Sequence, residues 1–169
     1  MDPSNASIQR WSSVTRNMSE YAATSLHGLF TVRGFVFLNL MSGIVTEAMT
    51  LDTGSVSNFS AQFVLDPGGV GGARSALAGI TNLAGILPTA GYSMSLNLGA
   101  SSIIISSADV KYVASGGDRN TMVTDGVVGF YPTTITFSSG GTTITGGKVR
   151  WTALWQPLSG GASLTPYVS

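Results

Sequence analysis

The stretch LFTVRGFVFLNL, from Leu29 to Leu40, has the alternating pattern that decides the fold class of this chain. Its even positions are apolar except for one glycine, whereas its odd positions mix polar residues with Phe35 and Phe37. A period of two over twelve residues, rich in aromatic and β-branched side chains, predicts one long β-strand. We expect the even face to pack on a core. Because Phe35 and Phe37 are too apolar to be left in water, we expect the odd face to meet a second subunit or another layer.

The composition indicates a single domain that carries few charges. At 169 residues the chain is long enough to bury roughly two thirds of its unfolded surface. Only 9% of the residues are charged, compared with about 25% in ordinary soluble domains. Eight basic residues balance eight acidic ones, so no global field attracts nucleic acid or a membrane surface. A surface so poor in charge is typical of one that partners partly cover.

After this stretch the chain continues as short alternating runs that are separated by glycine, proline, serine and asparagine. About eight to ten such runs predict an all-β sandwich or barrel. The last run, Lys148 to Gln156, places Trp151 and Trp155 on one face, and we expect both to anchor the core. A jelly roll over residues 28–169 is the leading architecture, with an immunoglobulin-like sandwich as the second.

Residues 1–27 carry a different pattern, which predicts a short amphipathic helix or arm. Asp2 and Pro3 have the sequence of a helix start, and apolar residues then recur every three or four positions. Trp11, Met18 and Tyr21 belong to this stripe, opposite a polar side. Three arrangements stay open: a helix packed across the sandwich, a helix that contacts a neighbouring subunit, and a disordered arm that orders only on assembly.

The segment LDTGS, from Leu51 to Ser55, resembles the active-site loop of aspartic proteases, in which two such loops meet at a dimer axis. The resemblance implies a homodimer in which Asp52 and its copy share a proton, one acting as base and the other as acid. Val127-Val128-Gly129 is a candidate for the motif that supports this loop. Thr50 stands where those enzymes have an apolar residue, and no flap hairpin is evident between the two motifs. The alternative, which we favour, is an Asp-Thr-Gly turn between two strands.

Residues that usually hold metals or cofactors are scarce. The chain has no cysteine and a single histidine, His27, so it has few of the side chains that zinc sites and Ser-His-Asp triads require. Asp109, Asp118 and Asp125 lack the spacing of an EF-hand, and we expect them to bind the backbone of their own turns. The glycine-rich loop 68–72 lacks the lysine of a phosphate-binding loop. We therefore expect neither a cofactor nor a metal.

In overall character the chain resembles small virion proteins of viruses and bacteriophages. The shared features are one jelly-roll-like domain, no cysteine, few charges, many Gly, Ser and Thr residues, and an amphipathic N-terminal segment. The resemblance extends diffusely over the whole length and implies a structural protein without catalysis, either a capsid subunit or a decoration or fibre protein. Its partners would be copies of itself in three-fold or icosahedral symmetry, or another capsid protein. We expect it to be made in a host cytoplasm and to reside in the virion.

The side chains expected at subunit contacts are aromatic or long and apolar: Phe35, Phe37, Trp11, Met18 and Tyr21. Nucleic acid is expected to bind weakly or not at all, because the basic residues are scattered and form no dense arm. The longest apolar run, Leu29 to Val45, contains Arg33 and Asn39 and is too polar for a membrane-spanning helix. A trimeric C1q- or TNF-like module, or a lectin-like one, is the alternative from another functional class and predicts exposed aromatic residues.

Overall fold

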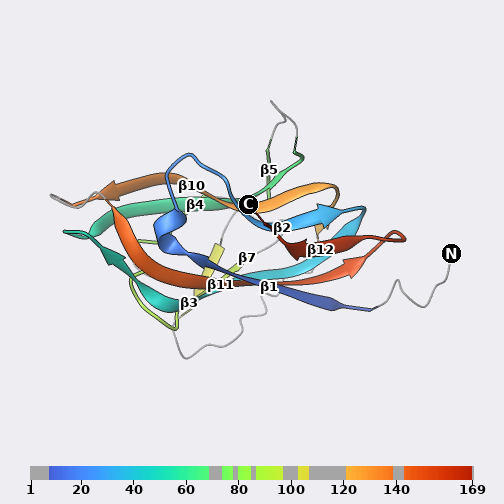
Figure 1. Cartoon of the computed structure of the whole chain (residues 1–169), viewed down its shortest axis with the longest axis horizontal. Coiled ribbons are helices and arrows are strands. Elements are labelled where there is room, and N and C mark those ends of the chain that lie inside the picture. Colours follow the sequence, from blue (N-terminus) through green and yellow to red (C-terminus); the bar gives the residue numbers. More distant parts are fainter. Residues whose placement is uncertain are drawn as a thin grey trace.

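The computed structural model describes residues 8–68, 74–77, 80–84, 87–96, 103–106, 121–138 and 143–168, which form two antiparallel β-sheets (Figure 1). Sheet A has, in spatial order, β1 (Arg10–Asn17), β11 (Ile144–Pro157), β3 (Val36–Leu51), β7 (Ser93–Leu96) and β8 (Ile103–Ser106), and β9 (Thr121–Val123) also pairs with β3. Sheet B has β12 (Ser163–Pro166), β2 (His27–Arg33), β10 (Gly126–Phe137), β4 (Val56–Asp66) and β5 (Ser75–Ala76), and β6 (Thr81–Asn82) also pairs with β4.

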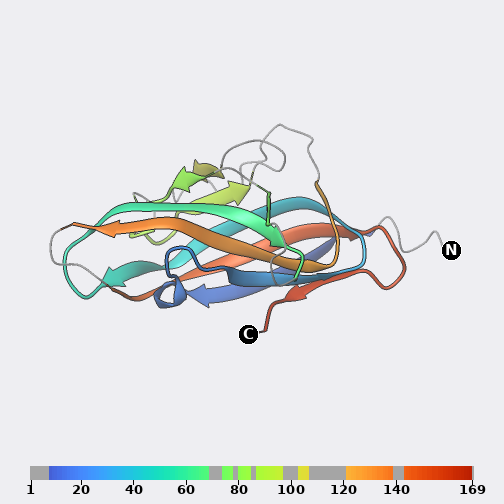
Figure 2. The same ribbon diagram turned by 90° about the horizontal axis from the view of Figure 1, so that it is seen from above.

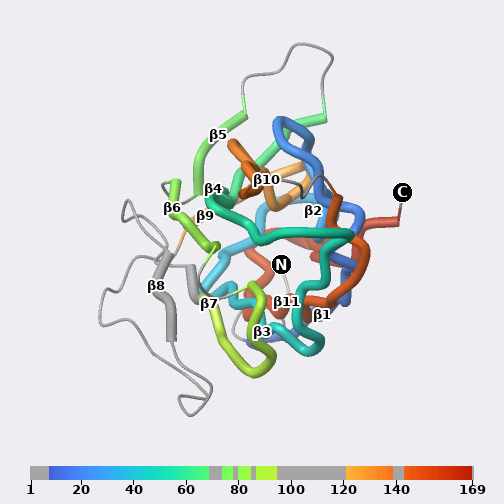
Figure 3. The backbone as a smooth tube through the Cα atoms, turned by 90° about the vertical axis from the view of Figure 1, so that its left-hand side faces the viewer, coloured from blue at the N-terminus to red at the C-terminus, as the bar shows by residue number. Residues whose placement is uncertain are grey.

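The two sheets pack face to face, so the protein is the all-β sandwich that the sequence predicts. Figure 2 shows the long strands β3, β4, β10 and β11 running along the longest dimension of the molecule. In the end-on view of Figure 3, β4 and β10 lie above the core and β3 and β11 lie below it. The described residues hold twelve strands rather than eight to ten, and β5 and β6 have only two residues each.

The stretch 29–40 is two strands, and the prediction of one long strand is wrong. β2 ends at Arg33 and β3 begins at Val36, with Gly34 between them in the left-handed region at a φ of 65°. The Gly34 N–H donates to Asp125 Oδ1 at 2.8 Å, which holds the turn. β2 and β3 belong to opposite sheets that face one core, so the alternation continues through the turn and conceals it. Of the expected inward positions, Phe30, Val32, Val36 and Leu38 are buried, whereas Leu40 is not.

The predicted N-terminal helix is also wrong. Residues 10–17 form β1, which pairs with β11 along its whole length, and only a single 3₁₀ turn, η2 (Met18–Glu20), follows. The segment Ser12-Ser13-Val14-Thr15 contains weak helix formers, and β11 offers it a full set of backbone partners. The described part of the predicted arm is therefore the first strand of sheet A. Asp2 and Pro3, the expected helix start, lie outside the described residues.

Trp151 occupies the centre of the core, as the sequence predicts for both tryptophans of the last long strand. Its side chain is fully buried, and its ring centroid lies 5.1 Å from that of Phe63 and 5.2 Å from that of Phe130. Trp151 Nε1 donates to Tyr21 Oη at 2.9 Å. On the neighbouring strand, Gly43 is directly opposite, and a Cβ added there would lie 2.4 Å from the indole ring. The indole therefore packs directly on the backbone of position 43, where only glycine, which has no Cβ, leaves room for it.

We expect Gly43→Ala to lower the free energy of unfolding by about 1–3 kcal/mol, because the new methyl group overpacks the Trp151 ring. Urea unfolding followed by tryptophan fluorescence measures this loss. Gly160→Ala is the matched control, since a Cβ there meets nothing within 4 Å, and it should change the stability by less than about 0.5 kcal/mol. Equal effects of the two substitutions would contradict this account of the core.

Candidate subunit interface

The outer face of sheet A, which is turned away from the core, carries a group of exposed apolar side chains. The exposed fractions are 53% for Trp11, 49% for Phe35, 61% for Met122 and 46% for Leu158. Partly buried neighbours on the same face complete a group that we term the outer patch: Trp11, Phe35, Phe37, Leu40, Met122, Leu154 and Leu158. No other strand of the described structure covers this side of β11 and β3.

The first row of the outer patch consists of Trp11, Leu154 and Leu40, which strand pairing places side by side. Trp11 of β1 is opposite Leu154 of β11, and Leu154 is opposite Leu40 of β3. The pairing register shifts between Leu38 and Leu40, so Asn39 is an extra residue on β3. This β-bulge turns Leu40 to the outer face although Leu38 points to the core. Asn39 Oδ1 is buried at the bulge and has no hydrogen-bond partner among the described residues.

The second and third rows continue the apolar surface to the end of the sheet. Phe37 lies between Gln156 of β11 and Met122 of β9. One step farther, the Leu158 N–H donates to the Phe35 carbonyl at 2.9 Å, which places these two residues next to each other. Paired strands are about 4.8 Å apart, and alternate residues of one strand are about 7 Å apart. The seven side chains of the outer patch therefore adjoin one another.

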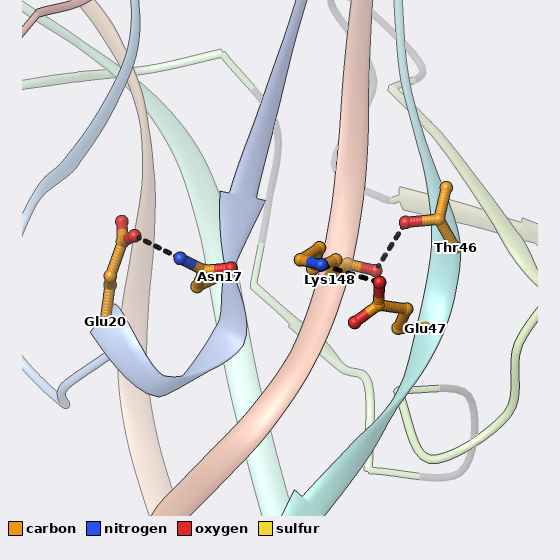
Figure 4. A network of polar contacts seen from close by, with 5 residues as sticks. All are labelled: Asn17, Glu20, Thr46, Glu47 and Lys148. Carbon is orange, nitrogen blue, oxygen red and sulfur yellow. Dashed lines mark hydrogen bonds and ion pairs between the residues drawn. The ribbon is translucent and has the colours of Figure 1, made fainter.

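Beyond the outer patch, the same face becomes polar and then charged. The row after Trp11 consists of Ser13, Thr152 and Ser42, with Ser13 Oγ 3.2 Å from Thr152 Oγ1. Farther along, Lys148 Nζ lies 2.6 Å from Glu47 Oε1 (Figure 4). Along β1, β11 and β3, the outer face of sheet A is therefore most apolar at the end that holds the outer patch.

The structure brings together Trp11, Phe35 and Phe37, which the sequence predicted at subunit contacts. Met18 and Tyr21, predicted with them, lie elsewhere, buried in the core of the chain with exposures of 0% and 5%. Burial raises the pKa of Tyr21, whose hydroxyl binds the core indole and carries no charge. These two side chains close the core beneath the connection between β1 and β2.

Four members of the outer patch were missed by the sequence analysis: Leu40, Met122, Leu154 and Leu158. The outward position of Leu154 could be predicted from the sequence, because Trp151 and Trp155 point to the core and the alternation of β11 turns Leu154 to the other face. Met122 joins the patch only because β9 pairs with β3, and no local pattern predicts such pairing.

Asp52 lies in the exposed connection between β3 and β4, at the other end of β3 from the outer patch. Its Oδ1 accepts the N–H groups of Thr53 at 2.7 Å and Thr143 at 3.2 Å. Val128, from the motif expected to support a protease loop, pairs with Leu65 near the far end of β4. That pairing places the motif roughly 30 Å along the strand from Asp52. Within one chain, the structure does not bring the two motifs together.

The described residues contain no group of three or more metal-ligating side chains. Asp125 Oδ1 accepts the Gly34 N–H in the turn before β3, whereas the sequence analysis expected this aspartate to bind the backbone of its own turn. Asp109 and Asp118 lie outside the described residues, as does the loop 68–72 apart from Gly68. The Gly68 N–H donates to Asp66 Oδ1 at 2.9 Å.

Comparisons of the chain with models of protein families, with curated proteins and with solved structures found no match. In the part of the chain that the structure describes, no helix has the length and apolar character needed to cross a membrane. The role of the outer patch has therefore to be inferred from its geometry.

His27 begins β2 and packs against the core rather than on the outer patch. Its Nε2 accepts the Ala22 N–H at 3.1 Å, and its ring meets the edge of Tyr21 with a centroid distance of 4.9 Å. Desolvation by burial lowers the pKa of His27; the Ala22 carbonyl and the charge of Glu20 oppose this, and Arg16 adds to it. The folded chain therefore favours neutral histidine.

We expect the free energy of unfolding to fall as the pH drops below 6.5, the ordinary pKa of histidine. In this range the unfolded chain binds a proton that folded His27 accepts only at lower pH, and the loss levels off below the folded pKa. His27→Gln, which keeps an acceptor for Ala22, should remove this slope. Asp66, whose pKa lies below its ordinary 3.8, adds a loss only at more acidic pH. Urea unfolding across a pH series tests this, and an unchanged slope in the variant would contradict it.

Proposed function

We propose that this protein is a structural subunit of a virion, either a capsid subunit or a capsid decoration or fibre protein, that assembles with copies of itself. The observation that carries the proposal is an exposed apolar patch on one face of a two-sheet antiparallel sandwich. The protein acts through its shape and its contacts, without catalysis, and its location is the virion.

The order of the strands supports a jelly roll. β4 pairs with β5, β3 with β7, β2 with β10 and β1 with β11, so the pairs spread outward from the middle of the chain like one long hairpin. Rolling this hairpin gives the paths β1-β11-β3-β7 and β2-β10-β4-β5, with β12 added beside β2. Jelly rolls occur in viral capsid and lectin domains. Because one fold hosts several functions, the surface has to distinguish among them.

The outer patch has the size of the apolar centre of a subunit contact. Half-exposed Trp11 and Phe35 each leave on the order of 100 Å² in water. With the other members, the patch exposes roughly 500 Å², the upper range for a monomeric protein. A standard interface covers about 800 Å² on each partner, with a polar rim around its apolar core. The hydroxyl row from Ser13 to Ser42 is suited to that rim.

The charge balance supports close packing of identical subunits. Eight basic and eight acidic residues leave a net charge of zero, so copies do not repel one another. A wall that contacts a genome needs many lysines and arginines for phosphate groups, and this chain has few. We therefore favour a role on the capsid surface, with nucleic acid a weak partner at most. Three-fold or icosahedral repetition would close one such contact into a ring or shell.

We expect Trp11→Asp and Phe35→Asp to give smaller species with the sheets intact, because each places a charge within the apolar surface of the contact. Light scattering on a sizing column and negative-stain images measure assembly, and circular dichroism measures the fold. Ile80→Asp is the matched control, since Ile80 is 60% exposed and lies outside the patch.

A wild-type shell or ring that the patch variants disrupt and Ile80→Asp preserves would support the proposal. Patch variants that assemble like wild type would contradict it. A discrete trimer that binds glycan through the exposed Trp11 ring would favour the lectin-like alternative instead.

A further inference from the structure

β1 is the longest open edge in the described part of the sandwich. It has eight residues, pairs with β11 on one side, and pairs with no described strand on the other. The other described edge strands are shorter: β5 and β6 have two residues, β9 has three, and β8 and β12 have four. β12 also ends at Pro166, which has no N–H to offer. Short strands and prolines keep sheet edges from pairing with other chains, and β1 has neither protection.

The backbone of β1 is regular, and small side chains flank its open side. Its register with β11 has no shift along its eight residues, whereas the register between β11 and β3 shifts several times. Ser13 and Thr15 are exposed on the outer face and leave room for an approaching strand. An open antiparallel edge presents alternating N–H and C=O groups, so it is complementary to a second copy of itself.

The two arginines of β1 do not prevent another strand from pairing with this edge, because both contact groups of their own chain. Arg16 Nη2 donates to the Gly28 carbonyl at 2.9 Å and the Tyr167 carbonyl at 2.5 Å, which ties β1 to the opposite sheet. The Arg10 guanidinium lies 5.5 Å from the ring centroid of Trp155. Charged side chains usually hinder edge pairing when they project from the strand, and these two are directed to groups of their own subunit.

We propose that β1 pairs with β1 of a second copy, antiparallel, about a two-fold axis perpendicular to sheet A. The inference rests on the proposed assembly function and names its first contact. Two six-stranded sheets become one continuous sheet. The axis keeps both outer patches on the same side of that sheet, toward opposite ends because the two β1 strands are antiparallel, and together they offer roughly 1,000 Å² of apolar surface to further copies.

This symmetry requires one residue of β1 to face its own copy. Opposed residues in antiparallel strands point to the same face, so their numbers differ by an even amount. Under a two-fold axis the pair at the centre is therefore a residue and its equivalent in the partner copy. Every other residue of β1 is opposite a residue with a different number.

The absence of cysteine from the sequence makes a direct test possible. Single cysteines are placed in turn at positions 11–16, the protein is oxidised or treated with a short linker that carries two thiol-reactive maleimide groups, and covalent dimers are read on a non-reducing denaturing gel. We expect one position to give dimers and its neighbours to give few, because only its Cβ atoms lie about 4.5–5.5 Å apart. Ser42→Cys, two strands from the edge in the same row as Ser13, is the control and should stay monomeric on the gel.

Ser13→Lys and Ser42→Lys provide a second matched pair on the same face. Lysine at position 13 places like charges on both sides of the new strand pair, so we expect loss of the β1-linked dimer. Lysine at position 42 should leave that dimer in place. Phe35→Asp, at the far end of the outer patch, should also retain the link between β1 strands.

The outcomes separate the two proposals. If large assemblies form but no cysteine in β1 gives a covalent dimer, the edge pairing is overturned and the proposed virion role is not. A dimer linked through β1 that never associates further would support edge pairing and contradict the virion role. A protein that stays monomeric at every concentration would overturn both.

Discussion

The packing of Trp151 between the two sheets is the contact on which the sandwich depends. The indole lies over Gly43 in its own sheet and meets Phe63 and Phe130 from the other. Its N–H reaches Tyr21 Oη, so the buried polar group is satisfied. Removing a core tryptophan commonly costs about 3–5 kcal/mol, a large fraction of the stability of one domain. Through Tyr21, the same contact also holds the connection between β1 and β2 against the core.

Once the inner faces are fixed, the outer faces follow, because neighbouring residues of a strand point to opposite sides. Trp151 and Trp155 point inward, so Leu154 points outward, and pairing brings Trp11 and Leu40 beside it. The outer patch is therefore a consequence of the same register that builds the core. With 9% charged residues, the chain has few groups that would keep such a surface in water.

The sequence predicted features that depend on local alternation and missed those that depend on distant pairing. The inward positions of β2, of β3 as far as Leu38, and of β11 follow from a period of two, and their burial confirms them, whereas the bulge at Asn39 turns Leu40 outward. The turn at Gly34 was missed because the alternation does not change phase there. β1 was mistaken for a helix because sparse apolar residues fit both periods, and its state is set by a partner strand near the other end of the chain. Of the outer patch, the sequence predicted Trp11, Phe35 and Phe37, but not that they share one surface.

The hydrogen bond from Ser12 Oγ to the Leu164 carbonyl joins residues 152 positions apart. Among the described strands, the whole of β1 pairs only with β11, so β1 cannot join a sheet before β11 is present. Contacts so distant in sequence form late in folding, and on a ribosome they form only after β11 has been synthesised. Until β11 emerges, Trp11 has no Leu154 beside it, and the outer patch does not yet exist. Under the proposed function, a chain that lacks β11 would therefore lack the surface through which copies associate. Folding of sheet A and competence to assemble would be one event.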